Sequence, residues 1–139
     1  MKSIIVLVGE IASGKGTVSD YLTEKYHASY HRFSSMLKDL ATRLYLPISR
    51  DILIRMSEVI RGGFGEDTMA KVIACDVEKD TSDVIVVDGA RRMADLEHLS
   101  KLPGFHLVYV TASLEMRFER IKNRGEKVGE KDLTFEQFK

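Results

Sequence analysis

The feature that most constrains this chain is a phosphate-loop pattern near its amino terminus. Residues Gly9–Thr17 match the pattern G-x-x-x-x-G-K. The β-branched apolar run Ile4–Val8 precedes the pattern, and a helical pattern that places Val18 and Leu22 on one face follows it. A strand, a glycine-rich turn and a helix in this order predict a loop at the carboxyl end of a parallel strand, where phosphate can bind.

The residue types of this loop suit a nucleoside triphosphate. Glycines allow backbone angles that turn successive N–H groups toward one point, and the helix that begins near Lys15 adds its positive end. The Lys15 ammonium then reaches the β- and γ-phosphates as a point charge. The alternative is a plain strand-to-helix turn with a surface lysine, which the agreement of motif and context disfavours. The expected donor-binding residues are Gly9, Ala12, Ser13, Gly14, Lys15, Gly16 and Thr17.

The rest of the chain alternates strand and helix patterns. The runs Val84–Val87 and Leu107–Val110 are continuously apolar, as in strands covered on both faces, and a weaker strand is expected at Ala28–Phe33. Ser49 and Ser113 are placed to cap helices. Strands that alternate with helices predict an α/β fold with a parallel sheet.

Two helices are expected in the middle of the chain, at Arg50–Arg61 and Glu66–Lys79, with Gly62–Gly63 ending the first. The one cysteine, Cys75, falls in an apolar helical pattern and is expected in the core. A single cysteine cannot form an internal disulfide, which is typical of a protein from a reducing compartment.

Length and charge restrict the classes of partner. The 139 residues fit one domain, 1–139. Lys+Arg and Asp+Glu are both 21, so a balanced chain gives no bulk attraction to nucleic acid or anionic membrane, and neither is expected as a partner. The run Ile4–Val8 is too short for a signal-peptide core or a membrane span, so a cytoplasmic location is the expectation.

The loop has one departure that carries a resemblance. Gly16 stands where most phosphate loops have Ser or Thr, and the hydroxyl follows at Thr17. This G-K-G-T run resembles the nucleoside monophosphate kinase family of P-loop kinases, such as adenylate kinase. The resemblance implies a three-layer α/β/α fold, ATP with Mg²⁺ as the donor, and a metal held largely through water near Thr17.

The third strand run ends in an acid followed by two arginines. Asp88 could orient Mg²⁺-bound water, although an Asp–Gly turn at a strand end is common for structural reasons. The run Asp88–Arg92 resembles the family motif Asp-Gly-x-x-Arg, whose arginine holds the acceptor's phosphate. That match indicates Arg92, while smaller relatives place the arginine one position earlier, at Arg91, so both are candidates.

The last helix carries an arginine stripe. Arg120 and Arg124 form an Arg-x-x-x-Arg pair, which resembles the start of the family's lid, where two arginines contact adenine and phosphate. The resemblance implies a short lid at about residues 120–135 and a catalytic role for both arginines. The alternative is a solvated charged face relieved by Glu119.

The acceptor side is less specific. The run Phe33–Lys38 resembles the family's acceptor-site helix, with Lys38 in an arginine's place and with Ser34 and Ser35 available as caps. The resemblance makes residues 34–80 an acceptor-binding helical insertion.

The residues after the second strand narrow the acceptor's chemistry. A hydroxyl acceptor, as in dephospho-coenzyme A kinase, needs a general base near that strand's end, and Phe33, Ser34 and Ser35 offer no carboxylate. A phosphate acceptor is already an anionic nucleophile. This favours transfer to a nucleoside or deoxynucleoside monophosphate, and the sequence does not specify the base or the sugar. A hydroxyl-acceptor kinase and a regulatory nucleotide-binding module with little catalysis remain alternatives.

Two further expectations concern what the chain lacks. No pair of histidines has metal-ligand spacing on a helix, so His27, His31, His98 and His106 are expected to be structural or surface residues. No apolar β-branched run follows Val110, whereas the family's sheet has a fifth strand. We expect four strands and an incomplete edge, covered by a second copy, another chain or the segment Asp132–Lys139, with weak discrimination among donor bases.

Overall fold

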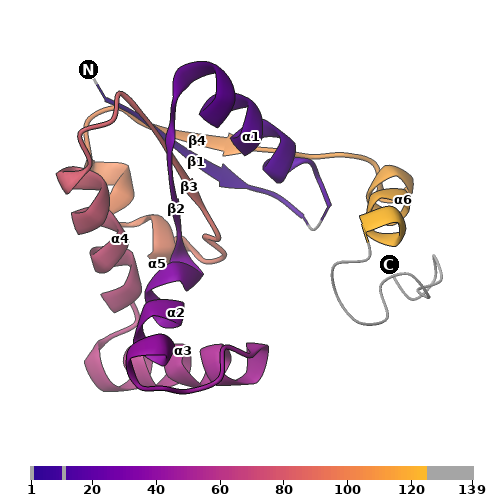
Figure 1. Cartoon of the computed structure of the whole chain (residues 1–139). Coiled ribbons are helices and arrows are strands. Elements are labelled where there is room, and N and C mark those ends of the chain that lie inside the picture. The colour runs from indigo at the N-terminus through magenta and orange to yellow at the C-terminus, as the bar shows by residue number, and fades with distance from the viewer. Residues whose placement is uncertain (1, 11, 125–139) are drawn as a thin grey trace.

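The computed structural model describes residues 2–10 and 12–124, and among them it contains one four-stranded sheet. All strand pairs are parallel and the order is β2-β3-β1-β4 (Figure 1). The strands are β1 (Ser3–Val8), β2 (Ser29–Arg32), β3 (Val84–Asp88) and β4 (Phe105–Tyr109). The helices are α1 (Lys15–Tyr26), α2 (Phe33–Arg43), α3 (Arg50–Phe64), α4 (Thr68–Lys79), α5 (Met93–Leu96) and α6 (Leu114–Arg124), with a 3₁₀ turn, η1, at Leu99–Lys101. The predicted α/β fold with a four-stranded parallel sheet is confirmed.

The strand order determines where a ligand can bind. β1 lies inside the sheet, and its Ile5 faces Val86 of β3 on one side and His106 of β4 on the other. The chain leaves β1 to reach β2 beyond β3, and later leaves β3 to reach β4 beyond β1. The connections thus depart in opposite directions from β1 and β3, and a crevice forms at the carboxyl ends of such strands.

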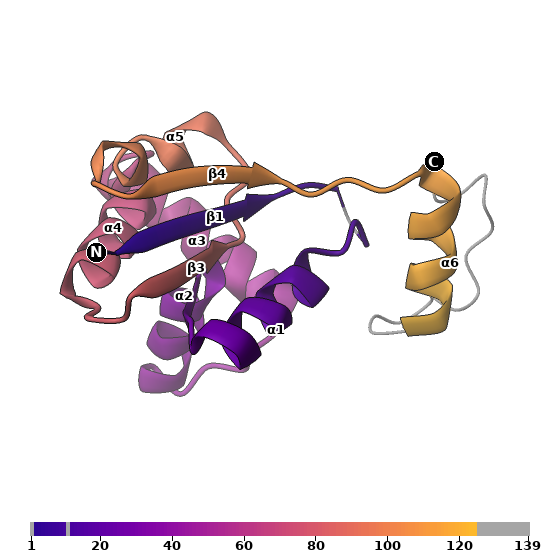
Figure 2. The same ribbon diagram turned by 90° about the horizontal axis from the view of Figure 1, so that it is seen from above.

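Helices cover the two faces of the sheet and create the core. On one face α1 packs Val18 and Leu22 against Leu7 and Val86. On the other, α2 and α4 pack against β1 and β3, so the molecule has three layers (Figure 2). The larger cluster is Ile4, Val6, Phe33, Leu37, Met69, Ala70, Ile73, Ala74, Val77, Ile85, Val87 and Leu99. Truncating a fully buried residue such as Ile85 to alanine should cost roughly 2–5 kcal/mol, which is a large part of a small domain's stability.

The outer strand β4 differs from the prediction. The run around Leu107 and Val108 was expected to be covered on both faces, but these side chains are 49% and 37% exposed. β4 pairs only with β1 in the described part of the chain, and it is an edge strand there. The expectation that a second copy, another chain or Asp132–Lys139 covers this edge stays a prediction, and Asp132–Lys139 lies outside the described residues.

The helical insertion shows one confirmed cap and one wrong helix end. Ser49 Oγ accepts a hydrogen bond of 3.3 Å from the Ile52 N–H, as expected of an N-cap. The prediction that Gly62–Gly63 ends this helix is wrong, because α3 continues to Phe64. The chain turns instead at Gly65, whose φ of 127° favours glycine.

Two more local predictions are wrong. Helix α2 begins at Phe33 directly after β2, with Arg32 at the N-cap position, so Ser34 and Ser35 lie inside its first turn and do not cap it. Cys75 is exposed, not part of the core. The buried face of α4 carries Ile73 and Val77, and two residues past Ile73 a helix has rotated by about 200°.

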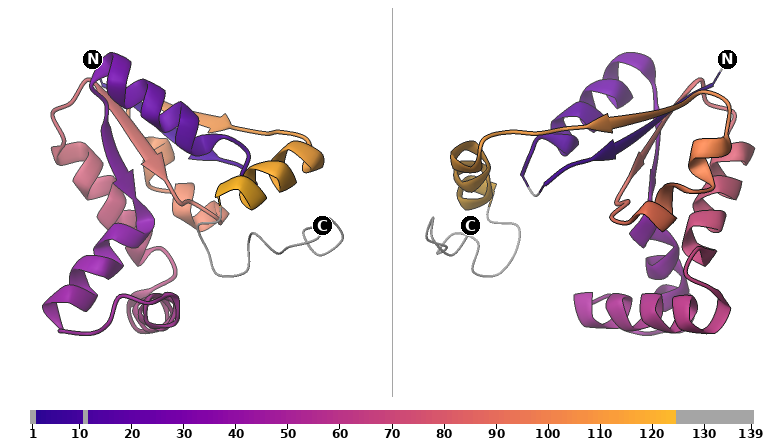
Figure 3. Two further views of the ribbon diagram at one scale, coloured as in Figure 1. Left: turned by 45° about the vertical axis from the view of Figure 1, so that its right-hand side comes forward. Right: turned by 180° about the vertical axis from the view of Figure 1, so that it is seen from behind.

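Helix α6 and the pair α2–α3 form two separate projections of the molecule (Figure 3).

The start of α6 confirms the second predicted cap, because Ser113 Oγ accepts a hydrogen bond of 3.1 Å from the Met116 N–H. Within the described residues no helix combines the length and the apolar character that crossing a bilayer requires.

Candidate active site

A cleft of about 1200 Å³ runs along the carboxyl ends of β1, β3 and β2. We call its two sides the donor wall, formed by Gly9–Thr17 with Arg120, and the acceptor wall, formed by Tyr30, Arg32 and Asp88–Arg92. Sites for one small molecule usually occupy about 300–1,000 Å³, so this cleft has room for two ligands side by side.

The backbone of the donor wall has the conformation that a phosphate cradle needs. Gly9 and Gly14 have φ values of 156° and 110°, and Ala12 has a φ of 60°. A Cβ on Gly9 would lie 2.1 Å from the backbone oxygen of Val110, which no side chain can tolerate. The glycine at the end of β1 therefore lets the loop pass directly against the end of β4.

Two side chains of the donor wall have unfilled bonding capacity toward phosphate. Lys15 folds back over the loop, and its Nζ donates to the Gly9 carbonyl at 2.9 Å. Ser13 is 4% exposed, and among the described residues its Oγ has no hydrogen-bond partner. A buried hydroxyl without a partner is costly unless a ligand supplies one, so the loop fits a bound phosphate.

Helix α6 brings a second cation to the donor wall. Arg120 donates from its guanidinium to the Ala12 carbonyl at 3.0 Å, across 108 residues of chain. The structure thus brings Arg120, one of the two arginines that the resemblance singled out, to the phosphate loop. The backbone of Arg124 ends α6, but its side chain lies outside the described residues, as does the predicted lid beyond it.

The loop is also tied to β4 through an acid and a phenol. Tyr109 donates a hydrogen bond to the Glu10 carboxylate. That bond lowers the pKa of Glu10 and raises the pKa of Tyr109, and the charge of Arg117 acts in the same direction on Glu10. Sequence analysis missed this pair because the two residues lie 99 positions apart.

Asp88 lies at the centre of the cleft, and its carboxylate is held in place. The residue is 8% exposed, its Oδ1 accepts from the Gly89 N–H at 2.8 Å, and its Oδ2 accepts from the Tyr30 hydroxyl at 2.8 Å. Burial and the hydrogen bond to Asp88 raise the pKa of Tyr30 to about 12, so this phenol is a hydrogen-bond donor at neutral pH. Each carboxylate oxygen has a second lone pair that can still accept a metal-bound water.

The two arginines after β3 differ in their partners. Both backbone N–H groups donate to Oδ2 of the buried Asp95, at 2.9 Å for Arg91 and 3.1 Å for Arg92, which fixes the turn. The Arg92 guanidinium then pairs with Glu66 at 2.9 Å. The Arg91 guanidinium lines the cleft and has no ion pair or hydrogen bond within the described residues.

The acceptor wall contains two residues that sequence analysis did not select. Tyr30 and Arg32 line the cleft from the end of β2. The signal that could have found them was their position at the carboxyl end of the predicted strand Ala28–Phe33. Lys38, which the resemblance did select, is exposed on α2 and is not part of the cleft lining.

The charge and oxygen ligands of the cleft suit a metal-bound polyphosphate. Counted over the described residues, the lining contains five cations, Lys15, Arg32, Arg91, Arg92 and Arg120, and three carboxylates, Glu10, Asp20 and Asp88, a difference of +2. Thr17 and Asp88 both line the cleft and offer oxygen atoms, the ligand type that Mg²⁺ prefers. These residues therefore fit Mg²⁺ held through water.

Sequence comparison gives two matches to families. A family model described as an AAA domain matches residues 5–137. A UPF0200 protein of Staphylothermus marinus is 32% identical over an alignment of 147 positions, which covers 99% of this chain and 77% of that protein. A UPF0200 protein of Hyperthermus butylicus is 27% identical, with 98% of this chain and 72% of that protein covered.

Solved structures agree on the fold. Shikimate kinase from Bacteroides thetaiotaomicron matches with a TM-score of 0.61 at 13% identity, over 97% of this chain and 72% of that chain. A protein from Eubacterium ventriosum, described as uncharacterized, matches with a TM-score of 0.54 at 21% identity. That alignment covers 99% of this chain and 66% of the other, so the chain spans just under two thirds of its length. At these identities the likeness shows a P-loop kinase-like fold and nothing finer.

Proposed function

Because the chain belongs to the AAA domain family and to the UPF0200 proteins, we propose that its phosphate loop serves a phosphotransferase. The reaction is transfer of the γ-phosphoryl group of a Mg²⁺-bound triphosphate, ATP, to a nucleoside or deoxynucleoside monophosphate. The observation that carries the proposal is the two-walled cleft, in which a phosphate loop lies opposite a group of arginines at the ends of β2 and β3.

The donor wall would hold the triphosphate. Backbone N–H groups of the loop and the amino end of α1 bind the phosphates, and the Ser13 hydroxyl gains the partner that it lacks. Lys15 exchanges its bond to the Gly9 carbonyl for the β- and γ-phosphates. Arg120, already above the loop at Ala12, neutralises charge that develops on the transferred group.

The acceptor wall would hold the monophosphate. Arg91 is the better candidate of the two arginines after β3, because within the described residues its guanidinium has no ion pair, while Arg92 is paired with Glu66. Arg32 approaches from the end of β2 and replaces Lys38 in this role. An arginine pair can bind a phosphate group through two parallel N–H donors each, which fixes the direction of attack.

Asp88 would organise the centre of the reaction. Thr17 and Asp88 would hold Mg²⁺ through water, and the ion would supply charge neutralisation at the phosphates. Gly89 and Tyr30 orient the oxygens of Asp88, which would accept hydrogen bonds from the water around such an ion, and Thr17 would offer a further oxygen at the loop.

One observation favours a second candidate, a kinase of a hydroxyl acceptor. Asp88 is a buried carboxylate on the lining of the cleft, and a base of this kind could accept the proton of an attacking hydroxyl. The monophosphate remains the first choice, because the arginines of the acceptor wall, Arg32, Arg91 and Arg92, suit an acceptor whose attacking group is itself a phosphate.

The test is a coupled assay of ATP consumption with a panel of ribo- and deoxyribonucleoside monophosphates, alongside dephospho-coenzyme A and shikimate. We expect turnover that depends on one or a few monophosphates, with the diphosphate product identified by ³¹P NMR. Phosphorylation of a hydroxyl acceptor with no monophosphate used would establish the second candidate. Saturable ATP binding without turnover on any acceptor would indicate a regulatory nucleotide-binding module.

A further inference from the structure

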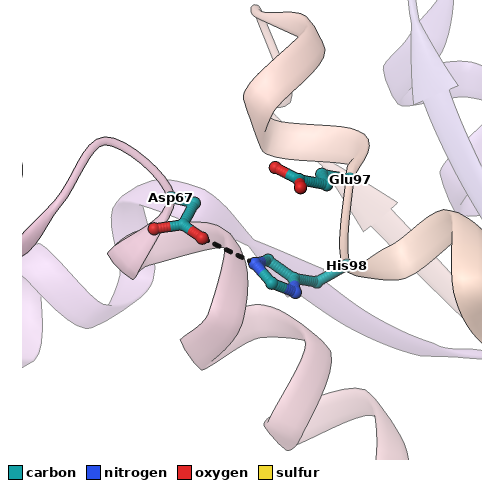
Figure 4. Close-up of side chains that lie close together, drawn as sticks. All are labelled: Asp67, Glu97 and His98. Carbon is teal, nitrogen blue, oxygen red and sulfur yellow. Dashed lines mark hydrogen bonds and ion pairs between the residues drawn. The ribbon is translucent and has the colours of Figure 1, made fainter.

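A cluster of metal-ligating side chains lies behind the acceptor wall. Asp67 is the N-cap residue of α4, while Glu97 and His98 form the connection between α5 and η1 (Figure 4). The His98 Nε2 lies 2.9 Å from Asp67 Oδ2. One ligand atom from each of the three residues lies within 4.8 Å of the other two.

The segments that carry these side chains are held in place by the core. Leu99, next to His98, is fully buried, and Met69, two residues after Asp67, is 3% exposed. Both belong to the larger core cluster. Because the two backbones are anchored independently of the polar side chains, the three ligand atoms stay near one another without any ion.

The cluster has more negative than positive charge. Two carboxylates lie beside one imidazole, and the Lys71 Nζ is 3.6 Å from Asp67 Oδ2. The Glu97 carboxylate has no ion pair or hydrogen bond within the described part of the chain. A divalent cation would offset the mutual repulsion of the two carboxylates.

We propose that Asp67, Glu97 and His98 form a binding site for a divalent transition-metal ion of the Zn²⁺ class. One imidazole nitrogen with two carboxylate oxygens suits Zn²⁺, whereas Mg²⁺ and Ca²⁺ prefer oxygen ligands alone. Zn²⁺ binds such ligands at about 2.0–2.2 Å, so Glu97, which is exposed, would rotate inward. Water completes the four ligands at the open side.

The site has a structural consequence for the cleft. Glu66, which precedes Asp67, holds the Arg92 guanidinium at 2.9 Å. A metal bound by Asp67, Glu97 and His98 would fix the start of α4 to the turn that follows α5, and thereby stabilise the acceptor wall. The proposal concerns metal binding and does not depend on the reaction assigned to the cleft.

The test is titration of the chelator-treated, nucleotide-free protein with ZnCl₂ by calorimetry, and with CoCl₂ by visible absorption. All variants carry Cys75→Ser, because the exposed Cys75 thiol is itself a Zn²⁺ ligand. We expect one saturable site, and weakening by about 10-fold or more in both His98→Gln and Glu97→Gln. The matched control His106→Gln removes an exposed histidine of β4 and should leave the affinity unchanged.

A fourth variant separates the site from nonspecific binding. Lys71→Gln removes the competing cation beside Asp67 and should strengthen Zn²⁺ binding by several-fold. Absence of saturable Zn²⁺ binding, or equal affinity in the parent and in Glu97→Gln, would overturn the proposal. Because Glu97 is exposed, that variant is expected to fold even if His98→Gln does not.

Discussion

The two walls of the cleft are built in different ways. The donor wall comes largely from one continuous segment, Gly9–Thr17, which links the buried strand β1 to α1 and includes the first residues of that helix. The acceptor wall is assembled from the ends of β2 and β3 and from the turn between β3 and α5. Its defining contacts join residues far apart in the chain, with 58 positions between Tyr30 and Asp88 and 26 between Arg92 and Glu66.

This difference separates two kinds of structural information. The donor wall is specified by backbone conformation, which glycines at fixed spacing impose locally. The acceptor wall is specified by side-chain pairs that exist only after the sheet has formed. Substitutions in the donor wall should therefore act on catalysis or on the backbone, while those in the acceptor wall should act first on ligand affinity.

The largest effect is expected for Lys15→Ala. The one hydrogen bond of its ammonium among the described residues is to the Gly9 carbonyl, so the fold should survive, while the phosphates lose a charge aimed at them. We expect turnover to fall by about 10²–10³-fold, as when one preorganised donor is removed, and the melting temperature to change little. Steady-state kinetics and thermal unfolding measure the two quantities. Turnover within twofold of the parent would contradict the donor-wall assignment.

The second comparison uses the two neighbouring arginines. Arg91→Ala should raise the KM for the acceptor by roughly 10–100-fold, the value of a lost hydrogen-bonded charge contact, with little effect on stability. Arg92→Ala should lower stability slightly, because the ion pair with Glu66 is lost, and should change the KM for the acceptor less than Arg91→Ala does. Initial rates at varied acceptor concentration, with the KM for ATP as internal control, check both variants. A larger rise of the acceptor KM in Arg92→Ala than in Arg91→Ala would assign the acceptor phosphate to Arg92.

The distinction between local backbone patterns and long-range side-chain pairs also explains which parts of the fold could be predicted from the sequence. The phosphate loop, the strands around Ile5 and Val86 and the cap at Ser49 were predicted, because glycine spacing, continuous apolar runs and capping residues act over a few positions. The four-stranded sheet followed from these local patterns. The exposed face of β4 was not foreseen, because its exposure depends on which elements pack there.

The residues of the candidate site also fall into those that local motifs predicted and those that only the folded structure reveals. The sequence selected Lys15, Asp88 and Arg120, and the structure brings all three to one cleft. It did not find Tyr30 or Arg32, because a strand-end residue gives no motif of its own. The cluster of Asp67, Glu97 and His98 was also missed, since its ligands have no helical spacing and meet only through tertiary packing.

The third prediction tests how the acceptor wall orients Asp88. Tyr30→Phe removes the hydroxyl at 2.8 Å from Oδ2 and leaves a buried carboxylate with one donor fewer. We expect a loss of about 1–3 kcal/mol in the free energy of unfolding and a fall in kcat, because the carboxylate loses its fixed direction. Chemical denaturation and the Mg²⁺ dependence of kcat are the measurements.

The pH dependence of this contact gives a control. The pKa of Tyr30 is raised to about 12 in the folded protein, above the ordinary value of 10.0. A raised pKa means that the stabilisation is fully present below the unfolded value and is lost as pH rises through the folded value. The stability difference between the parent and Tyr30→Phe should thus be constant from pH 7 to about pH 9 and shrink above pH 10. A difference that changes between pH 6 and 8 would show that another group controls Asp88.

The smallest effect is expected for Gly62→Ala in the helical insertion. Gly62 lies inside α3, a helix with no fully buried residue, and a Cβ there would meet nothing within 4 Å. Alanine at an exposed helix position is more favourable than glycine by about 0.5–1 kcal/mol, so Gly62→Ala should raise the midpoint of denaturation slightly. Gly9→Ala is the matched change in the donor wall, and it should lower the midpoint because its Cβ would lie 2.1 Å from the Val110 oxygen. If Gly62→Ala destabilised the protein instead, α3 would not continue through Gly62, and the contrast between a loop that requires its glycines and a helix that only tolerates them would fail.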